Sequence, residues 1–144
     1  MKPLRVCAVS LFLMLVSSSL WGQAKTYKVI VNASNPMTSI SYENVSRIFL
    51  KKSSKFPNGI SAAPVDLPGN SPIRERFSED VYGQSASAVD AYWQKLIFSG
   101  RDIPPAQKSE KGVLDFVRSN EGAIGYVSAT ADTSGVKVIL VTKF

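Results

Sequence analysis

The segment from residue 70 to residue 74 holds the side chains best suited to binding chemistry. It reads Asn70-Ser71-Pro72-Ile73-Arg74. A serine cap followed by proline at the first helical position predicts that a helix starts here. The first N–H groups of a helix lack acceptors within the helix, and the helix dipole favours negative charge at that end. We therefore expect this segment to offer a seat for an anion.

A second polar loop offers similar groups. Ser34-Asn35-Pro36 follows a predicted strand, and Thr38 and Ser39 come close behind. Their hydroxyl and amide groups could hydrogen bond to an anion, although such residues are also ordinary constituents of turns. The candidate ligand-binding residues are thus Asn70, Ser71, Arg74, Ser34, Asn35, Thr38 and Ser39.

Catalytic chemistry is poorly represented in the chain. It contains no histidine, and its one cysteine is Cys7. Histidine-based acid/base catalysis, Ser-His or Cys-His nucleophilic pairs and His/Cys zinc sites are therefore excluded. The 11 acidic residues form no tight cluster in the sequence. We expect a non-enzymatic protein with no catalytic residue, no cofactor and no metal, and carboxylate-based hydrolysis remains a remote alternative.

The N-terminus has the pattern of a secretory signal peptide. Lys2 and Arg5 precede an apolar run of about 11 residues, 6–16, and small residues follow near position 24. The run is too short to span a bilayer as a helix, and no cysteine stands at the expected cleavage site. We expect residues 1–24 to be removed and a single domain, 25–144, to work in the periplasm or outside the cell without a lipid anchor.

The rest of the chain alternates predicted strands and helices. Buried strands are expected at 27–31, 63–67, 123–127 and 136–141, and helices are expected to start at Ser41, Ser71, Ser87 and Ser109. The helix that starts at Ser87 is expected to reach Phe98 and to bury Tyr92, Trp93 and Phe98. This alternation predicts an α/β domain with a central, mostly parallel sheet flanked by helices.

Several segments in their serial order resemble one protein family, the substrate-binding proteins of phosphate ABC transporters. These segments are Ile48-Phe49-Leu50, Val65-Asp66, Pro68-Gly69-Asn70-Ser71-Pro72-Ile73-Arg74, Tyr92-Trp93, Phe98-Ser99-Gly100-Arg101, Pro104-Pro105 and Glu121-Gly122-Ala123-Ile124-Gly125-Tyr126-Val127. The resemblance covers about residues 27–127 and is strongest to short, single-lobe members. It implies one lobe of the type II periplasmic-binding-protein fold, whose full-length members close two lobes over an anion.

The resemblance also implies roles for individual residues. Ser71 and Arg74 match the family's Gly-Ser-Gly-Thr-Arg loop, as hydroxyl donor and cation respectively. Departures weaken the match, because Pro72 has no N–H to donate and Ile73 has no hydroxyl. Leu67 stands where full-length members often carry an arginine. A lone lobe would also leave its anion half exposed to water.

Two interpretations of the function follow. The first is a binder of phosphate or a similar oxyanion that serves an ABC transporter permease or a membrane sensor. The second is a protein-interaction module that has the lobe fold but no longer binds a ligand, and a homodimer is one form that it could take. Ser71 could be a plain helix cap, and Arg74 is expected to be exposed under either interpretation. Nucleic acid is not an expected partner, because the chain lacks a basic surface interleaved with aromatic residues.

Overall fold

The computed structural model describes residues 26–144. The predicted signal peptide, 1–24, lies outside the described residues and stays a prediction. Within the described part of the chain, no helix is both long enough and apolar enough to cross a membrane.

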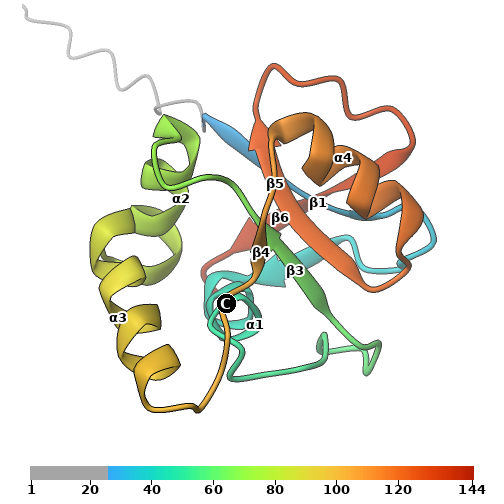
Figure 1. Cartoon of the computed structure of the whole chain (residues 1–144). Helices are drawn as coiled ribbons and strands as arrows, with labels where there is room; N and C mark the ends of the chain where they lie inside the picture. Colours follow the sequence, from blue (N-terminus) through green and yellow to red (C-terminus); the bar gives the residue numbers. More distant parts are fainter. Residues whose placement is uncertain (1–25) are drawn as a thin grey trace, which may run out of the picture.

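A six-stranded sheet forms the centre of the molecule (Figure 1). The strands lie side by side in the order β2-β6-β1-β5-β3-β4. Strand β1 runs antiparallel to both of its neighbours, and the remaining pairs are parallel. The sheet is therefore mostly parallel, as predicted, with one reversed strand in its interior. The strands are β1 Tyr27–Asn32, β2 Ser39–Ser41, β3 Ala63–Asp66, β4 Ala106–Gln107, β5 Ala123–Ser128 and β6 Val136–Thr142.

Four helices flank this sheet: α1 Tyr42–Phe49, α2 Pro72–Tyr82, α3 Ala86–Phe98 and α4 Glu110–Ser119. Successive side chains of a strand point to opposite faces, so two neighbours on β5 identify the two layers. Tyr126 stacks on Phe77 of α2, with ring centroids 3.8 Å apart. A Cβ atom on Gly125 would lie only 2.7 Å from Val113 of α4. Helix α4 thus covers one face, α2 covers the other, and glycine lets α4 approach closely.

Three of the four predicted helix starts are confirmed. The hydroxyls of Ser41, Ser71 and Ser109 each accept a hydrogen bond from the N–H three residues later. The prediction for the third helix was two residues off. Its cap is Ser85, whose hydroxyl accepts from the N–H of Ala88 at 3.2 Å, so that Ser87 lies within α3.

Aromatic side chains fill the core between the sheet and α1 and α2. Phe77 packs against Phe49 and Tyr27 as well as Tyr126. Further along the chain, Trp93 is buried as expected. The prediction for Phe98 was wrong, because α3 packs mainly on α2 and its last residue extends beyond that contact, leaving the Phe98 side chain 90% exposed.

Two short strands were not predicted. β2 and β4 are three and two residues long and lie at the two edges of the sheet. Segments this short hold too few residues for an alternation of apolar and polar side chains to predict a strand, and their extended shape comes from pairing with β6 and β3. The sequence predicts a loop over residues 101–107, and 106–107 form β4 instead.

Candidate functional site

The predicted anion seat does begin a helix at the surface. Ser71 caps α2, since its hydroxyl accepts from the N–H of Arg74 at 3.3 Å. The N–H of Ser71 donates to the carbonyl of Pro68 at 3.0 Å, which closes the turn between β3 and the helix. Asn70 is exposed and Ser71 is half-buried. Among residues 26–144, the backbone N–H of Ile73 has no hydrogen-bond acceptor, as is usual for the first turn of a helix.

The position of Arg74 differs from the prediction of an exposed side chain. Arg74 is only 2% exposed. Its guanidinium binds the Asp90 carboxylate with two hydrogen bonds, Nη2 to Oδ1 at 2.7 Å and Nη1 to Oδ2 at 3.3 Å. Its Nε atom lies 3.5 Å from Oδ2 of Asp66. A cation held between two carboxylates is already neutralised, so Arg74 joins α2 to β3 and α3.

Asp66 is the centre of this buried cluster. It accepts hydrogen bonds from the hydroxyl of Tyr126 and from the N–H of Leu67. Burial raises the pKa of the Asp66 carboxyl above its ordinary value, against the opposing effects of Tyr126 and Arg74. For Arg74, burial lowers the pKa of the guanidinium, but Asp90 and Asp66 outweigh that effect and the net shift is upward. The cluster therefore keeps Arg74 charged and holds a carboxylate at the end of β3.

A pattern in the sequence could have indicated that Arg74 is buried. The inward face of α2 consists of Arg74, Phe77, Ser78 and Val81, which repeat at helical spacing. The sequence by itself predicts Ile73 and Phe77 on the inner face of this helix, whereas in the structure Ile73 is only partly buried. The partners that neutralise Arg74 are 8 residues before it and 16 residues after it, and no local pattern reveals them.

The second candidate loop is held together largely by its own hydrogen bonds. The side-chain carbonyl of Asn32 accepts from both the N–H and the hydroxyl of Ser34, at 3.0 and 2.7 Å. Asn35 is buried, and its side-chain carbonyl accepts from the N–H of Met37 at 3.1 Å. Lys137 donates to the backbone carbonyl of Asn35 at 3.0 Å. Of the remaining candidates, Thr38 and Ser39 are exposed, and both belong to the segment that pairs with β6.

The two candidate loops lie at opposite ends of the sheet. Val31 pairs with Ile124, and Ile124 pairs with Pro64. From that level, the antiparallel β1 continues out of the sheet into Ser34. Strand β3 runs in the other direction, toward Asp66 and α2. The seven candidate residues therefore belong to two separate surfaces, and only the surface at Asn70 and Ser71 lies at the carboxyl end of parallel strands, where ligands usually bind in open α/β sheets.

Acidic side chains stand at each helix start that faces this carboxyl end. Glu110, the first residue of α4, accepts a hydrogen bond from the N–H of Ser128 at the end of β5. Glu75 lies in the first turn of α2 and accepts from the N–H of Ala86 at 3.0 Å. Glu43 lies in the first turn of α1. These acids complement the helix dipoles internally and lower the attraction of the surface for a further anion. Within residues 26–144 there is also no group of three side chains that could hold a metal ion.

Comparisons of sequence identify no relatives. No family model matches the chain, and no curated protein sequence matches it. Comparison of the folds does find similar structures.

The chain resembles an ABC-type phosphate transport receptor from Vibrio cholerae, with a TM-score of 0.63 and 19% identity over 83% of this chain. It resembles a putative phosphate ABC transporter substrate-binding protein with bound phosphate from Clostridium perfringens (TM-score 0.61, 19% identity, 82% of this chain). A possible phosphate-binding protein from Planctomyces limnophilus DSM 3776 is similar as well (TM-score 0.60, 15% identity, 81% of this chain). The match spans only 47%, 45% and 41% of those chains. The chain thus shares the fold of somewhat less than half of each of these chains.

Proposed function

We propose that this chain is an exported, non-catalytic, solute-binding-like domain that takes phosphate or a similar oxyanion at the start of α2. It would deliver the bound anion to an ABC transporter permease, or report the anion to a membrane sensor. The observation that carries the proposal is the helix start at exposed Asn70 and half-buried Ser71, which follows a parallel strand. The solved structures that share this fold include phosphate receptors, and one of them holds phosphate.

The groups at this helix start predict weak binding by the chain alone. The hydroxyl of Ser71 and the N–H of Ile73 can donate to an anion, whereas Arg74 is neutralised by Asp66 and Asp90. An anion bound only on one side stays largely in water, where each contact is screened. We expect a dissociation constant on the order of 1 mM, which is roughly 4 kcal/mol of binding free energy. Tighter capture would need a second surface that closes over the anion.

The test is an NMR titration of the exported domain with phosphate at low ionic strength, with chloride as the non-specific control. Saturable shifts at the backbone of Ser71 and Ile73 are the expected result. Asn70→Asp places a negative charge beside the seat without touching the cap, and should weaken binding several-fold by repulsion. Gln94→Glu makes the same charge change at an exposed site on α3 and should leave binding unchanged. Equal shifts with chloride and phosphate would exclude the oxyanion seat.

A protein-interaction module is the second candidate, and the buried cluster favours it. Arg74, the cation expected to face the anion, is paired with two carboxylates, and Glu75 and Glu110 add further acidic groups at the carboxyl end of the sheet. Sedimentation velocity over a hundredfold range of concentration tests self-association. A reversible dimer together with a silent phosphate titration supports this second function, and a monomer that binds phosphate supports the first.

A further inference from the structure

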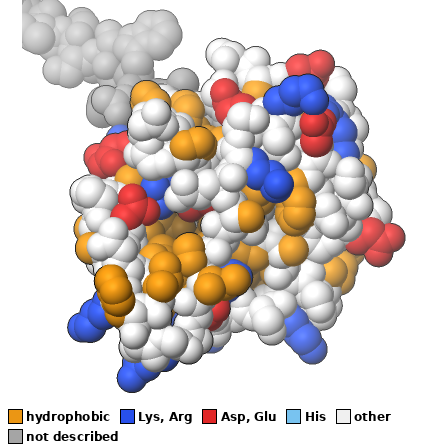
Figure 2. Space-filling view, in the orientation of Figure 1, with side chains coloured by type: hydrophobic (Ala, Val, Ile, Leu, Met, Phe, Trp, Pro, Cys, Tyr) orange, Lys and Arg blue, Asp and Glu red, His pale blue; other side chains and the backbone are white. Residues whose placement is uncertain are grey.

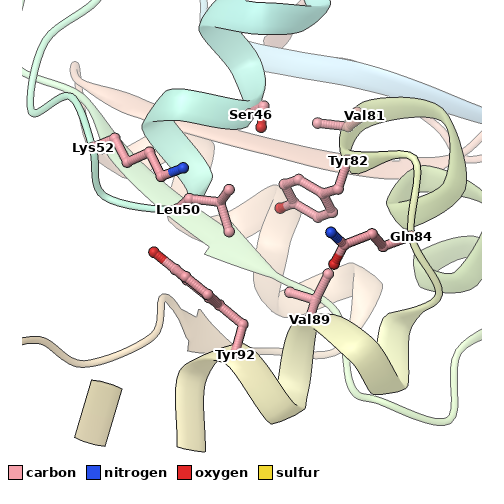
Figure 3. A pocket seen from close by; sticks show the side chains of 8 residues that line it. All are labelled: Ser46, Leu50, Lys52, Val81, Tyr82, Gln84, Val89 and Tyr92. Carbon is pink, nitrogen blue, oxygen red and sulfur yellow. The ribbon is translucent and has the colours of Figure 1, made fainter. Parts of the chain in front are cut away.

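A hollow of about 340 Å³ lies among α1, α2 and α3 (Figure 3). Its apolar surface comes from Leu50, Val81 and Val89, of which the two valines are buried. Ligand pockets for small molecules usually start at about 300 Å³ and combine an apolar wall with a few polar groups. None of the candidate residues at 70–74 lines this hollow, so it is separate from the seat at the start of α2. Figure 2 shows hydrophobic side chains gathered on the α3 side of the molecule, around a depression.

Five polar side chains complete the lining: Ser46, Lys52, Tyr82, Gln84 and Tyr92. In Figure 3 the Lys52 ammonium and the Tyr82 hydroxyl are both directed into the space between α1 and α3. Across residues 26–144, none of the five side chains forms a hydrogen bond or an ion pair with another residue. Polar groups that meet in one hollow without protein partners are available to a ligand, because their hydrogen-bonding capacity is otherwise met only by water.

The chemistry of these groups selects for a ligand with acceptor atoms. Lys52 provides donors only, Gln84 adds an amide N–H₂, and Tyr82 and Tyr92 each add a hydroxyl that can donate. No acidic side chain lines the hollow. Burial raises the pKa of the Tyr82 hydroxyl, and the charge of Asp66 adds to that effect, so this hydroxyl stays protonated and able to donate. A carboxylate facing Lys52 would therefore be paired with a cation and hydrogen bonded by neutral donors, which is the strong form of such contacts.

We propose that the hollow among α1, α2 and α3 binds a small monocarboxylate with a compact apolar body. The carboxylate faces Lys52 and the tyrosine hydroxyls, and the apolar body packs on Leu50, Val81 and Val89. The size of the hollow limits the ligand to a small aromatic or short aliphatic acid. This site stands independently of the oxyanion seat, because the two share no residue.

The test uses benzoate and its neutral isostere benzamide as probes of the exported domain, with shifts mapped by NMR. Benzoate should saturate with a dissociation constant on the order of 1 mM, with the largest shifts at the Gln84 side-chain amide and at the backbone of Val89 and Tyr92. Benzamide should bind at least fivefold more weakly. The indole of Trp93, whose ring lies 5.3 Å from that of Tyr92, gives an independent fluorescence readout.

Matched variants isolate the role of the charge. Lys52→Gln keeps most of the side-chain length and should abolish the preference for benzoate over benzamide. Lys95→Gln removes an exposed lysine of α3 outside the hollow and should leave that preference intact. The proposal is overturned if benzoate and benzamide shift the same resonances equally, if the shifts map away from the hollow, or if Lys52→Gln and Lys95→Gln behave alike. A phosphate titration that moves Ser71 but not Gln84 would show that the two sites are separate.

Discussion

At the scale of single residues, Arg74 lies in a sequence motif expected to bind an anion, but it has a structural role. Its type and its place at a helix start suit an anion site, yet its guanidinium is buried between Asp66 and Asp90. A buried arginine that satisfies two carboxylates cannot be removed without leaving at least one buried charge unpaired. The same geometry that removes Arg74 from the anion site makes it important for stability.

We expect Arg74→Ala to lower the free energy of unfolding by about 3 kcal/mol, because Asp66 would remain buried without its cation. Urea denaturation followed by circular dichroism measures this change. Arg76→Ala is the matched control: Arg76 lies on the exposed side of the same helix and pairs with Glu79 and Asp80, so the cost should stay below about 1 kcal/mol. Equal losses for the two variants would contradict a structural role for Arg74. Because Arg74→Ala is expected to destabilise the fold, loss of phosphate binding in this variant would not show that Arg74 contacts phosphate.

Asp66 gives a prediction for pH dependence. Its folded-state pKa is raised by burial, so the folded protein holds this proton at pH values where the unfolded chain has released it. The corresponding stabilisation is therefore present below the ordinary pKa near 3.8 and is lost as the pH rises through the folded-state pKa. Carbon-detected NMR of the carboxyl groups should give Asp66 a midpoint above 3.8. Exposed Asp115 serves as the contrast, since Lys111 lowers its pKa; a midpoint for Asp66 at or below that of Asp115 would refute the prediction.

At the scale of elements, Ser85 and Ser87 at the start of α3 have different structural roles. Ser85 caps the helix through the N–H of Ala88, whereas Ser87 lies in the first turn. Ser85→Ala should therefore destabilise the protein by about 1 kcal/mol, the usual cost of losing a cap. Ser87→Ala should change stability by less than about 0.5 kcal/mol. Thermal and urea unfolding of both variants measure the difference. A larger loss of stability for Ser87→Ala than for Ser85→Ala would indicate that Ser87 caps the helix.

The elements also show what the sequence can and cannot predict. Strands β1, β3, β5 and β6 and the caps at Ser41, Ser71 and Ser109 depend on local patterns of apolar residues and capping hydroxyls, and those predictions are confirmed. The edge strands β2 and β4 exist only through pairing with distant segments. The exposure of Phe98 and the burial of Arg74 likewise depend on contacts between helices that are remote in the sequence. Helical spacing alone cannot distinguish these cases.

At the scale of the whole molecule, the direction of β1 decides how the candidate residues are distributed. All other strands of the sheet run one way, so the loops and helices that follow them meet at one end. The reversed β1 delivers Ser34 and Asn35 to the opposite end. In the sequence, both loops look like similar connections that follow a strand. Only the pairing of the strands shows that the two loops lie too far apart to bind one small anion together.

This arrangement predicts that the two loops respond independently. In a phosphate titration, Asn70→Asp should shift the midpoint observed at Ser71 and leave any midpoint observed at Thr38 and Ser39 unchanged, because sites without shared partners at opposite ends of the sheet do not couple. Thr38→Val, which removes one hydroxyl, should have the reverse selectivity. Backbone NMR of the two variants and their double variant measures both midpoints at once. Additive effects in the double variant would agree with the topology. A change at Thr38 caused by Asn70→Asp would contradict the prediction, because it would mean that the two ends of the sheet are coupled.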